Sequence, residues 1–247
     1  MNKTRRRETD PPKYIADAIR EAWPGGVIDM PVDWDDAPFW EVYPQLKAGL
    51  SRIQRGAVRA AVCYEREPEG GPRWGEASNP DEDPPDWHDE SRSYGLFFVS
   101  SMDQRLKFAT DTIEPDEEGI ERRFQGEGRV GYVVAVSLVA PFAVVTLDQM
   151  EVFENGSRSE PDVDPHIFGL DGRKVDPEDH YRELVDETGF TILKGLRAEI
   201  VGVLGKFAVD VIPERDLEWP VRWLRAREDV VVGKPITVRD AFFFRSV

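Results

Sequence analysis

Residues 130–147 constrain the fold more than any other part of this chain. They read VGYVVAVSLVAPFAVVTL and contain no charged residue, although 32% of the chain is charged. A run this apolar must leave water, because burial of apolar surface gains about 25 cal/mol per Å². The run therefore predicts either the centre of a protein core or a membrane span.

The composition of the run favours buried strands over a membrane helix. Seven of its 18 residues are valine, which prefers strands, and Pro141 would break a helix. No cluster of Lys or Arg flanks the run, as would be expected beside a membrane helix. We predict two central buried strands, near residues 130–140 and 142–153, that meet at Pro141.

Helices are predicted at the N-terminus. One apolar stripe at helical spacing follows two prolines and is formed by Ile15, Ala18, Ile19, Ala22 and Trp23. A second helix, beginning near Pro44, carries Leu46, Leu50 and Ile53. Strand-like composition then dominates the middle of the chain, over residues 57–64, 94–100, 105–113 and 122–125.

The C-terminal third again favours helices. Asp176 and Pro177 predict a helix start, and Gly189 predicts its end. A second helix is predicted over residues 195–207, followed by a strand over residues 208–212. Thr237 and Asp240 form a capping-box pattern before an aromatic run that we expect to dock on the core.

This order predicts an α+β fold with a mostly antiparallel sheet, because helices and strands segregate along the chain. Residues 1–10 read as a flexible basic tail, and residues 11–247 as a single domain. That domain has a possible division into a helix-plus-sheet part, 11–160, and a helical part, 161–247.

The net charge of −16 and the pI near 4.7 limit the possible partners. Such a charge repels nucleic acid and anionic membranes, and favours a protein partner with a basic surface. The one cysteine, Cys63, excludes an intramolecular disulfide and a cysteine-based zinc site. With no secretory signal at residues 1–12, the sequence predicts a cytoplasmic protein.

The clearest candidate for partner binding is the acidic stretch 81–90, which holds six acids and no Lys or Arg. Tryptophans lie close to it, and aromatic side chains dominate the energetics of many interfaces. The predicted partner-binding residues are Trp74, Asp81, Glu82, Asp83, Asp86, Trp87, Asp89 and Glu90.

A metal site is the alternative. In an extended segment alternate side chains point the same way, so Asp162, Asp164 and His166 could converge on one divalent cation. The glycine pattern at residues 126–131 matches a dinucleotide fingerprint, but it precedes a strand instead of following one. We predict no cofactor.

These features favour a non-enzymatic, acidic protein-binding module that docks a basic partner. In overall character, though not in any motif, the chain resembles bacterial immunity and antitoxin proteins. The alternatives are a metal-dependent hydrolase using Asp162, Asp164 and His166, and a subunit of a larger assembly. In the last case the predicted interface is formed by Trp219, Trp223 and residues 242–244. The oligomeric state is open.

Overall fold

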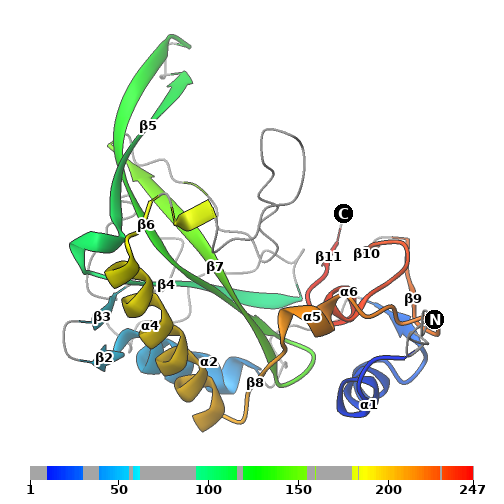
Figure 1. The fold of residues 1–247 in the computed structure, drawn as a ribbon. Coiled ribbons are helices and arrows are strands. Elements are labelled where there is room, and N and C mark those ends of the chain that lie inside the picture. The colour runs from blue at the N-terminus through cyan, green and yellow to red at the C-terminus, as the bar shows by residue number, and fades with distance from the viewer. Residues whose placement is uncertain are drawn as a thin grey trace, which may run out of the picture.

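The computed structural model describes residues 10–29, 39–55, 58–61, 93–115, 119–154, 159, 180–182, 184–228 and 230–246. At its centre, β6 (Glu121–Ser137) and β7 (Phe142–Phe153) form a long antiparallel pair (Figure 1). The turn between them is residues 138–141. The two central strands predicted from the uncharged run are therefore confirmed.

The main sheet has the order β2-β3-β4-β6-β7-β8, and β5 pairs with β6. Its pairs are antiparallel except that β8 runs parallel to β7. The other strands are β2 (Gln54–Arg55), β3 (Val58–Ala61), β4 (Tyr94–Ser101), β5 (Lys107–Pro115) and β8 (Asp210–Val211). This confirms the predicted α+β class with a mostly antiparallel sheet.

Helices cover both faces of the sheet. On one face, α2 (Phe39–Ser51) and α4 (Glu187–Lys206) pack against residues such as Val134 (Figure 1). The other face contacts α1 (Lys13–Ala22), α5 (Glu214–Leu217) and α6 (Val238–Phe242) through residues such as Val133. Because alternate strand residues face opposite sides, both sets must be apolar, which explains the unbroken run.

Short elements complete the described part. A 3-10 helix, η1 (Gln104–Leu106), joins β4 to β5. β1 (Val27–Ile28) pairs in parallel with β9 (Arg225–Ala226), and β10 (Val230–Val231) pairs antiparallel with β11 (Arg245–Ser246). Among the helices in these ranges, none has the length and apolar character that crossing a membrane would require.

Two helix boundaries differ from the prediction. α2 begins at Phe39, before Pro44, which lies inside the helix.

α4 begins at Glu187, because the Asp186 side chain accepts a hydrogen bond from the Gly189 backbone N–H at 2.7 Å. Gly189 therefore lies in the first turn of α4 and does not end a helix. An added Cβ there would lie 2.3 Å from Val185 Cγ1, so glycine allows this close approach.

The aromatic run at the C-terminus belongs to the core. Phe242, Phe243 and Phe244 are all buried, so the prediction that they form an assembly interface is wrong. Ser93 holds this run in place, because its hydroxyl accepts from the Phe244 N–H at 2.8 Å and its own N–H donates to the Phe244 carbonyl at 3.0 Å. The predicted capping box between Thr237 and Asp240 is confirmed at the start of α6.

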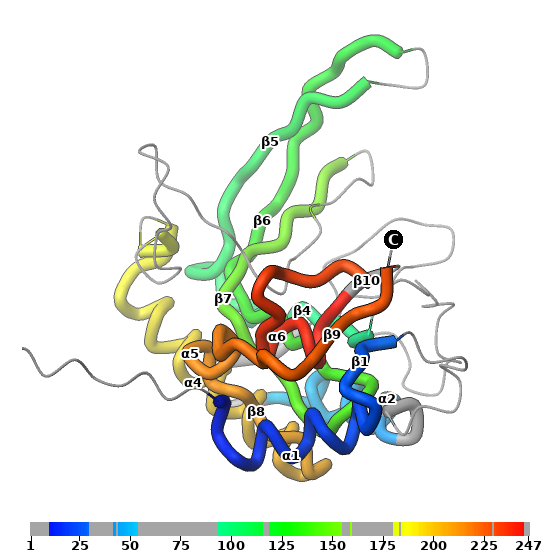
Figure 2. The backbone as a smooth tube through the Cα atoms, turned by 90° about the vertical axis from the view of Figure 1, so that its right-hand side faces the viewer, coloured from blue at the N-terminus to red at the C-terminus, as the bar shows by residue number. Residues whose placement is uncertain are grey.

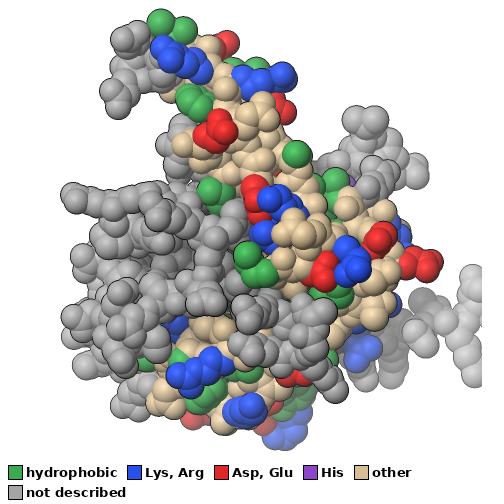
Figure 3. All heavy atoms as spheres, turned by 90° about the vertical axis from the view of Figure 1, so that its left-hand side faces the viewer, with side chains coloured by type: hydrophobic (Ala, Val, Ile, Leu, Met, Phe, Trp, Pro, Cys, Tyr) green, Lys and Arg blue, Asp and Glu red, His purple; other side chains and the backbone are tan. Residues whose placement is uncertain are grey.

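The hairpin of β5 and β6 extends beyond the rest of the sheet as an arm (Figures 1 and 2). β7 pairs with β6 only as far as Gly126, so the preceding β6 residues pair with β5 alone among the described strands. Basic and acidic side chains are interspersed along the arm (Figure 3), and Arg123 pairs with Asp111. Ile113 and Ile120 are more than half exposed.

Candidate binding site

The residues that the sequence singles out for partner binding and for metal binding lie outside the described ranges. This holds for the partner-binding set at Trp74, Trp87 and the acids of residues 81–90, and for the metal candidates Asp162, Asp164 and His166. The structure does describe where the corresponding segments of chain join the folded body.

The segment 62–92 joins two neighbouring strands of the sheet. It follows Ala61, which pairs with Ser100 of β4, and it precedes Ser93. Ser93 is fully buried, and its carbonyl accepts a hydrogen bond from the Leu138 N–H at 2.9 Å, beside the turn between β6 and β7. The segment that contains the acidic stretch is therefore joined at both ends to residues of the central sheet or next to it.

The segment 160–179 is attached to β7 at both ends. Before it, the Ser159 N–H donates to the Glu151 carbonyl at 3.0 Å, and the Ser159 hydroxyl accepts from the Glu151 N–H at 2.8 Å. After it, the Tyr181 hydroxyl donates to Asp148 Oδ1 at 3.0 Å. The two attachment points are three residues apart on one strand.

The negative charge of the sequence is concentrated in the two segments between these attachment points. Residues 62–92 hold ten acids and three bases, and residues 160–179 hold seven acids and two bases. Together the two segments account for 12 of the 16 net negative charges of the chain.

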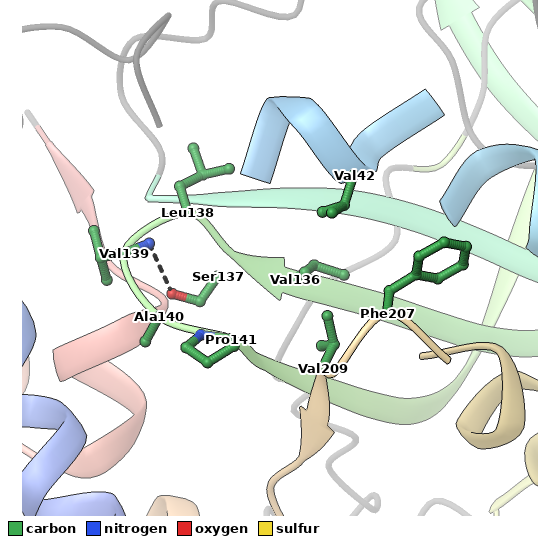
Figure 4. A pocket seen from close by; sticks show the side chains of 9 residues that line it. All are labelled: Val42, Val136, Ser137, Leu138, Val139, Ala140, Pro141, Phe207 and Val209. Carbon is green, nitrogen blue, oxygen red and sulfur yellow. Dashed lines mark hydrogen bonds between the residues drawn. The ribbon is translucent and has the colours of Figure 1, made fainter. Parts of the chain in front are cut away.

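A pocket of about 350 Å³ lies at the end of the sheet where β6 turns into β7 (Figure 4). Its walls come from this turn, from α2, and from the chain that follows α4. The lining residues are Val42, Val136, Ser137, Leu138, Val139, Ala140, Pro141, Phe207 and Val209. The volume is within the range of small-ligand pockets, about 300–1,000 Å³.

The chemistry of this pocket is that of an apolar cavity. Its one polar side chain, Ser137, already accepts a hydrogen bond from the Val139 N–H at 3.2 Å (Figure 4). No lining residue is titratable. General acid–base catalysis needs a side chain that exchanges a proton, and no lining side chain does so near neutral pH, so these walls offer mainly apolar contact.

The most perturbed titratable group in the described part is Tyr181, which is buried under β7. Burial raises the pKa of its hydroxyl well above the ordinary value, and the neighbouring Asp148 carboxylate raises it further. Asp148 Oδ1 also accepts from the Gln149 N–H at 2.8 Å. The phenol therefore stays protonated and serves as a hydrogen-bond donor to a buried carboxylate.

Replacing Tyr181 with phenylalanine should lower the free energy of unfolding by about 2 kcal/mol at pH 7, because a buried carboxylate loses a donor. The raised pKa favours the protonated phenol in the folded state, so this stability is complete below the unfolded pKa of about 10 and is lost at higher pH. Urea unfolding of both proteins from pH 7 to pH 11 should show the gap closing above about pH 10. A gap that stays constant over this range would contradict the assignment.

Arg129 forms a second buried polar contact, at the point where β6 changes its neighbour from β5 to β4. Its Nη1 donates to the Ser101 carbonyl at 3.1 Å, and its Nη2 donates to Glu127 at 2.6 Å. Glu127 also pairs with Lys107. Burial alone would raise the pKa of Glu127, but the bonds and charges of Lys107 and Arg129 hold it below its ordinary value.

Neither a metal cluster nor the strand-to-helix context of a dinucleotide fingerprint is found in the ranges that the structure describes. No group of three or more His, Cys, Asp and Glu side chains in these ranges could hold a metal ion. The glycine pattern at residues 126–131 lies within β6, so it does not open a helix.

Sequence reasoning did not identify the pocket, and no local signal could have shown it. Its walls come from three separated parts of the chain, and their residues read individually as ordinary core positions. Comparison of the chain with protein-family models, with curated proteins and with solved structures finds no match.

Proposed function

We propose that the protein is a non-enzymatic, cytoplasmic binding module that docks a protein partner with a basic surface. Its general character is like that of immunity and antitoxin proteins. The proposed contact residues are Trp74, Asp81, Glu82, Asp83, Asp86, Trp87, Asp89 and Glu90.

The concentration of acids in residues 62–92 carries this proposal. This segment holds ten acids and three bases, which is seven of the 16 net negative charges of the chain. Concentrated charge of one sign speeds encounter with a surface of the opposite sign, and aromatic side chains then supply contact area. Attachment at Ala61 and Ser93 ties this segment to the sheet.

Affinity capture tests the proposal with full-length protein. In one variant the six acids of residues 81–90 are replaced by their amides, Asp by Asn and Glu by Gln. From an extract of the source organism at low salt, the wild type should retain a basic protein that the variant does not. Raising the salt to about 0.5 M should release it, because screening shortens the range of charge interactions to a few Å. Equal retention by both proteins would contradict the proposal.

A metal-dependent hydrolase is the second candidate, and the Asp162, Asp164 and His166 spacing favours it. The carboxylate and imidazole groups of these residues are common ligands of divalent metals. Elemental analysis after purification and a thermal shift on adding Mn²⁺, Zn²⁺ or Mg²⁺ test this directly. Protein that contains no metal and shows no shift with any of these ions would exclude it.

A further inference from the structure

Several arginines lie in and next to β9, which pairs with β1 (Figure 2). Residues 219–227 read WPVRWLRAR, with three arginines, two tryptophans and no acid. The guanidinium of Arg20, from α1, lies 5.2 Å from the centre of the Trp223 ring. We use the name arginine face for Arg20, Arg222, Trp223, Arg225 and Arg227.

The pairing of β1 with β9 turns two of these arginines outward. Val27 pairs with Arg225, and Ile28 pairs with Ala226. Ile28 is fully buried, whereas Val27 is 39% exposed. Because alternate residues of a strand face opposite sides, Arg225 and Arg227 lie on the exposed side with Val27.

The arginines of this face differ in whether they form an ion pair with an acidic side chain. Arg20 pairs with Asp17 at 3.1 Å, and Arg227 pairs with Asp29 at 3.2 Å. Arg222 and Arg225 are exposed, and neither makes an ion pair with another residue of the described ranges. Among the described residues, no carboxylate therefore neutralises the guanidinium groups of Arg222 and Arg225, which lie within two residues of Trp223 in the sequence.

We propose that the arginine face docks an acidic peptide segment of a partner protein. Carboxylates match the two parallel N–H donors of a guanidinium, and arginine and tryptophan are enriched at protein interfaces. Nucleic acid would present the same charge, but its polymer of phosphates is repelled by a protein of net charge −16. A short acidic segment meets less of this repulsion.

This inference goes beyond the proposed function, because it concerns a surface of opposite charge on a different part of the molecule. The acids proposed to dock a basic partner lie in residues 81–90, whereas the arginine face comes from α1, β9 and the residues next to β9. The two proposals therefore fail independently. Substitutions on the arginine face should leave capture of the basic partner unchanged.

Fluorescence anisotropy with the full-length protein tests the inference. The probe is a labelled decapeptide of alternating aspartate and serine, and its control replaces each aspartate with asparagine. The wild type should bind the acidic probe at about 50 mM salt and should not bind the control. The double variant Arg222→Glu, Arg225→Glu should bind the probe at least about tenfold more weakly. Arg222→Lys with Arg225→Lys should weaken binding by about threefold, because lysine keeps the charge but loses the paired donors.

The matched control is Lys194→Glu with Arg197→Glu, which makes the same charge change at two exposed positions of α4. Its affinity for the probe should stay within about twofold of wild type. Thermal unfolding of every variant shows whether the fold is intact. The inference is overturned if the wild type does not bind the probe, if the α4 variant loses as much affinity, or if a DNA oligonucleotide of equal charge binds more tightly.

Discussion

Replacing Gly131 with alanine is expected to destabilise the protein by about 3 kcal/mol. Gly131 lies in β6 opposite Ser100 of β4. An added Cβ would lie 2.5 Å from the carbonyl oxygen of Val99 and 2.9 Å from Phe98 Cζ. That oxygen is part of the backbone of a central strand, so it cannot move without disturbing the ladder between β4 and β6. Thermal unfolding should show a midpoint lowered by about 6–12 °C.

Gly202→Ala supplies the matched control for this prediction. Gly202 lies on the exposed side of α4, and nothing lies within 4 Å of the position that its Cβ would take. The same substitution should here stabilise the protein by about 0.5–1 kcal/mol, because alanine favours the helix over glycine. If both variants shift the midpoint in the same direction, the packing described around Gly131 is wrong.

The second large effect is expected from Arg129→Met, which should cost about 3 kcal/mol. Methionine keeps much of the volume but leaves the Ser101 carbonyl without this donor and removes one partner of Glu127. Arg129 is only 3% exposed, so water cannot readily replace these contacts. The free energy of unfolding from urea titrations measures the loss.

Arg123→Met is the control on the same strand. Arg123 pairs with Asp111, but both side chains are largely exposed, so this loss should stay below about 0.5 kcal/mol. The two variants should also differ in their response to pH. The pKa of Glu127 is lowered in the folded state, so its contribution is present above the unfolded value of about 4.3 and is lost as the pH falls below it. Equal losses at residues 123 and 129 would contradict the burial of Arg129.

The parts of the fold that could be predicted were those in which one local signal agreed with the tertiary structure. The uncharged run 130–147 indicated strands with two buried faces, and the spacing of Ile15, Ile19 and Trp23 indicated α1. The predicted helix end at Gly189 was wrong, because glycine at this position allows a close contact with Val185. A contact of this kind has no sequence signature.

The role of Arg129 could not be predicted either. In the sequence it precedes the apolar run as an ordinary flanking charge. Its burial depends on the place where β6 changes its neighbour from β5 to β4, next to Ser101. The arginine face is different, because the sequence of residues 219–227 already shows three arginines without an acid. What the sequence could not show was that Arg20 joins them from α1.

The proposed role of the acidic stretch in partner binding is tested most directly by a comparison at matched charge. One full-length variant carries amides at the six acids of residues 81–90. The other carries amides at six exposed acids that make no ion pair within the described ranges: Glu21, Glu121, Glu154, Asp210, Glu214 and Glu228. Both variants raise the net charge by the same amount.

The measurement is the dissociation constant for the captured basic partner as a function of salt concentration. We predict that the variant in residues 81–90 loses at least about tenfold in affinity at low salt, and that its affinity depends less steeply on salt. The variant in the body should bind nearly as wild type does. Equal affinities of the two variants would show that net charge alone, and not the acidic stretch, recruits the partner.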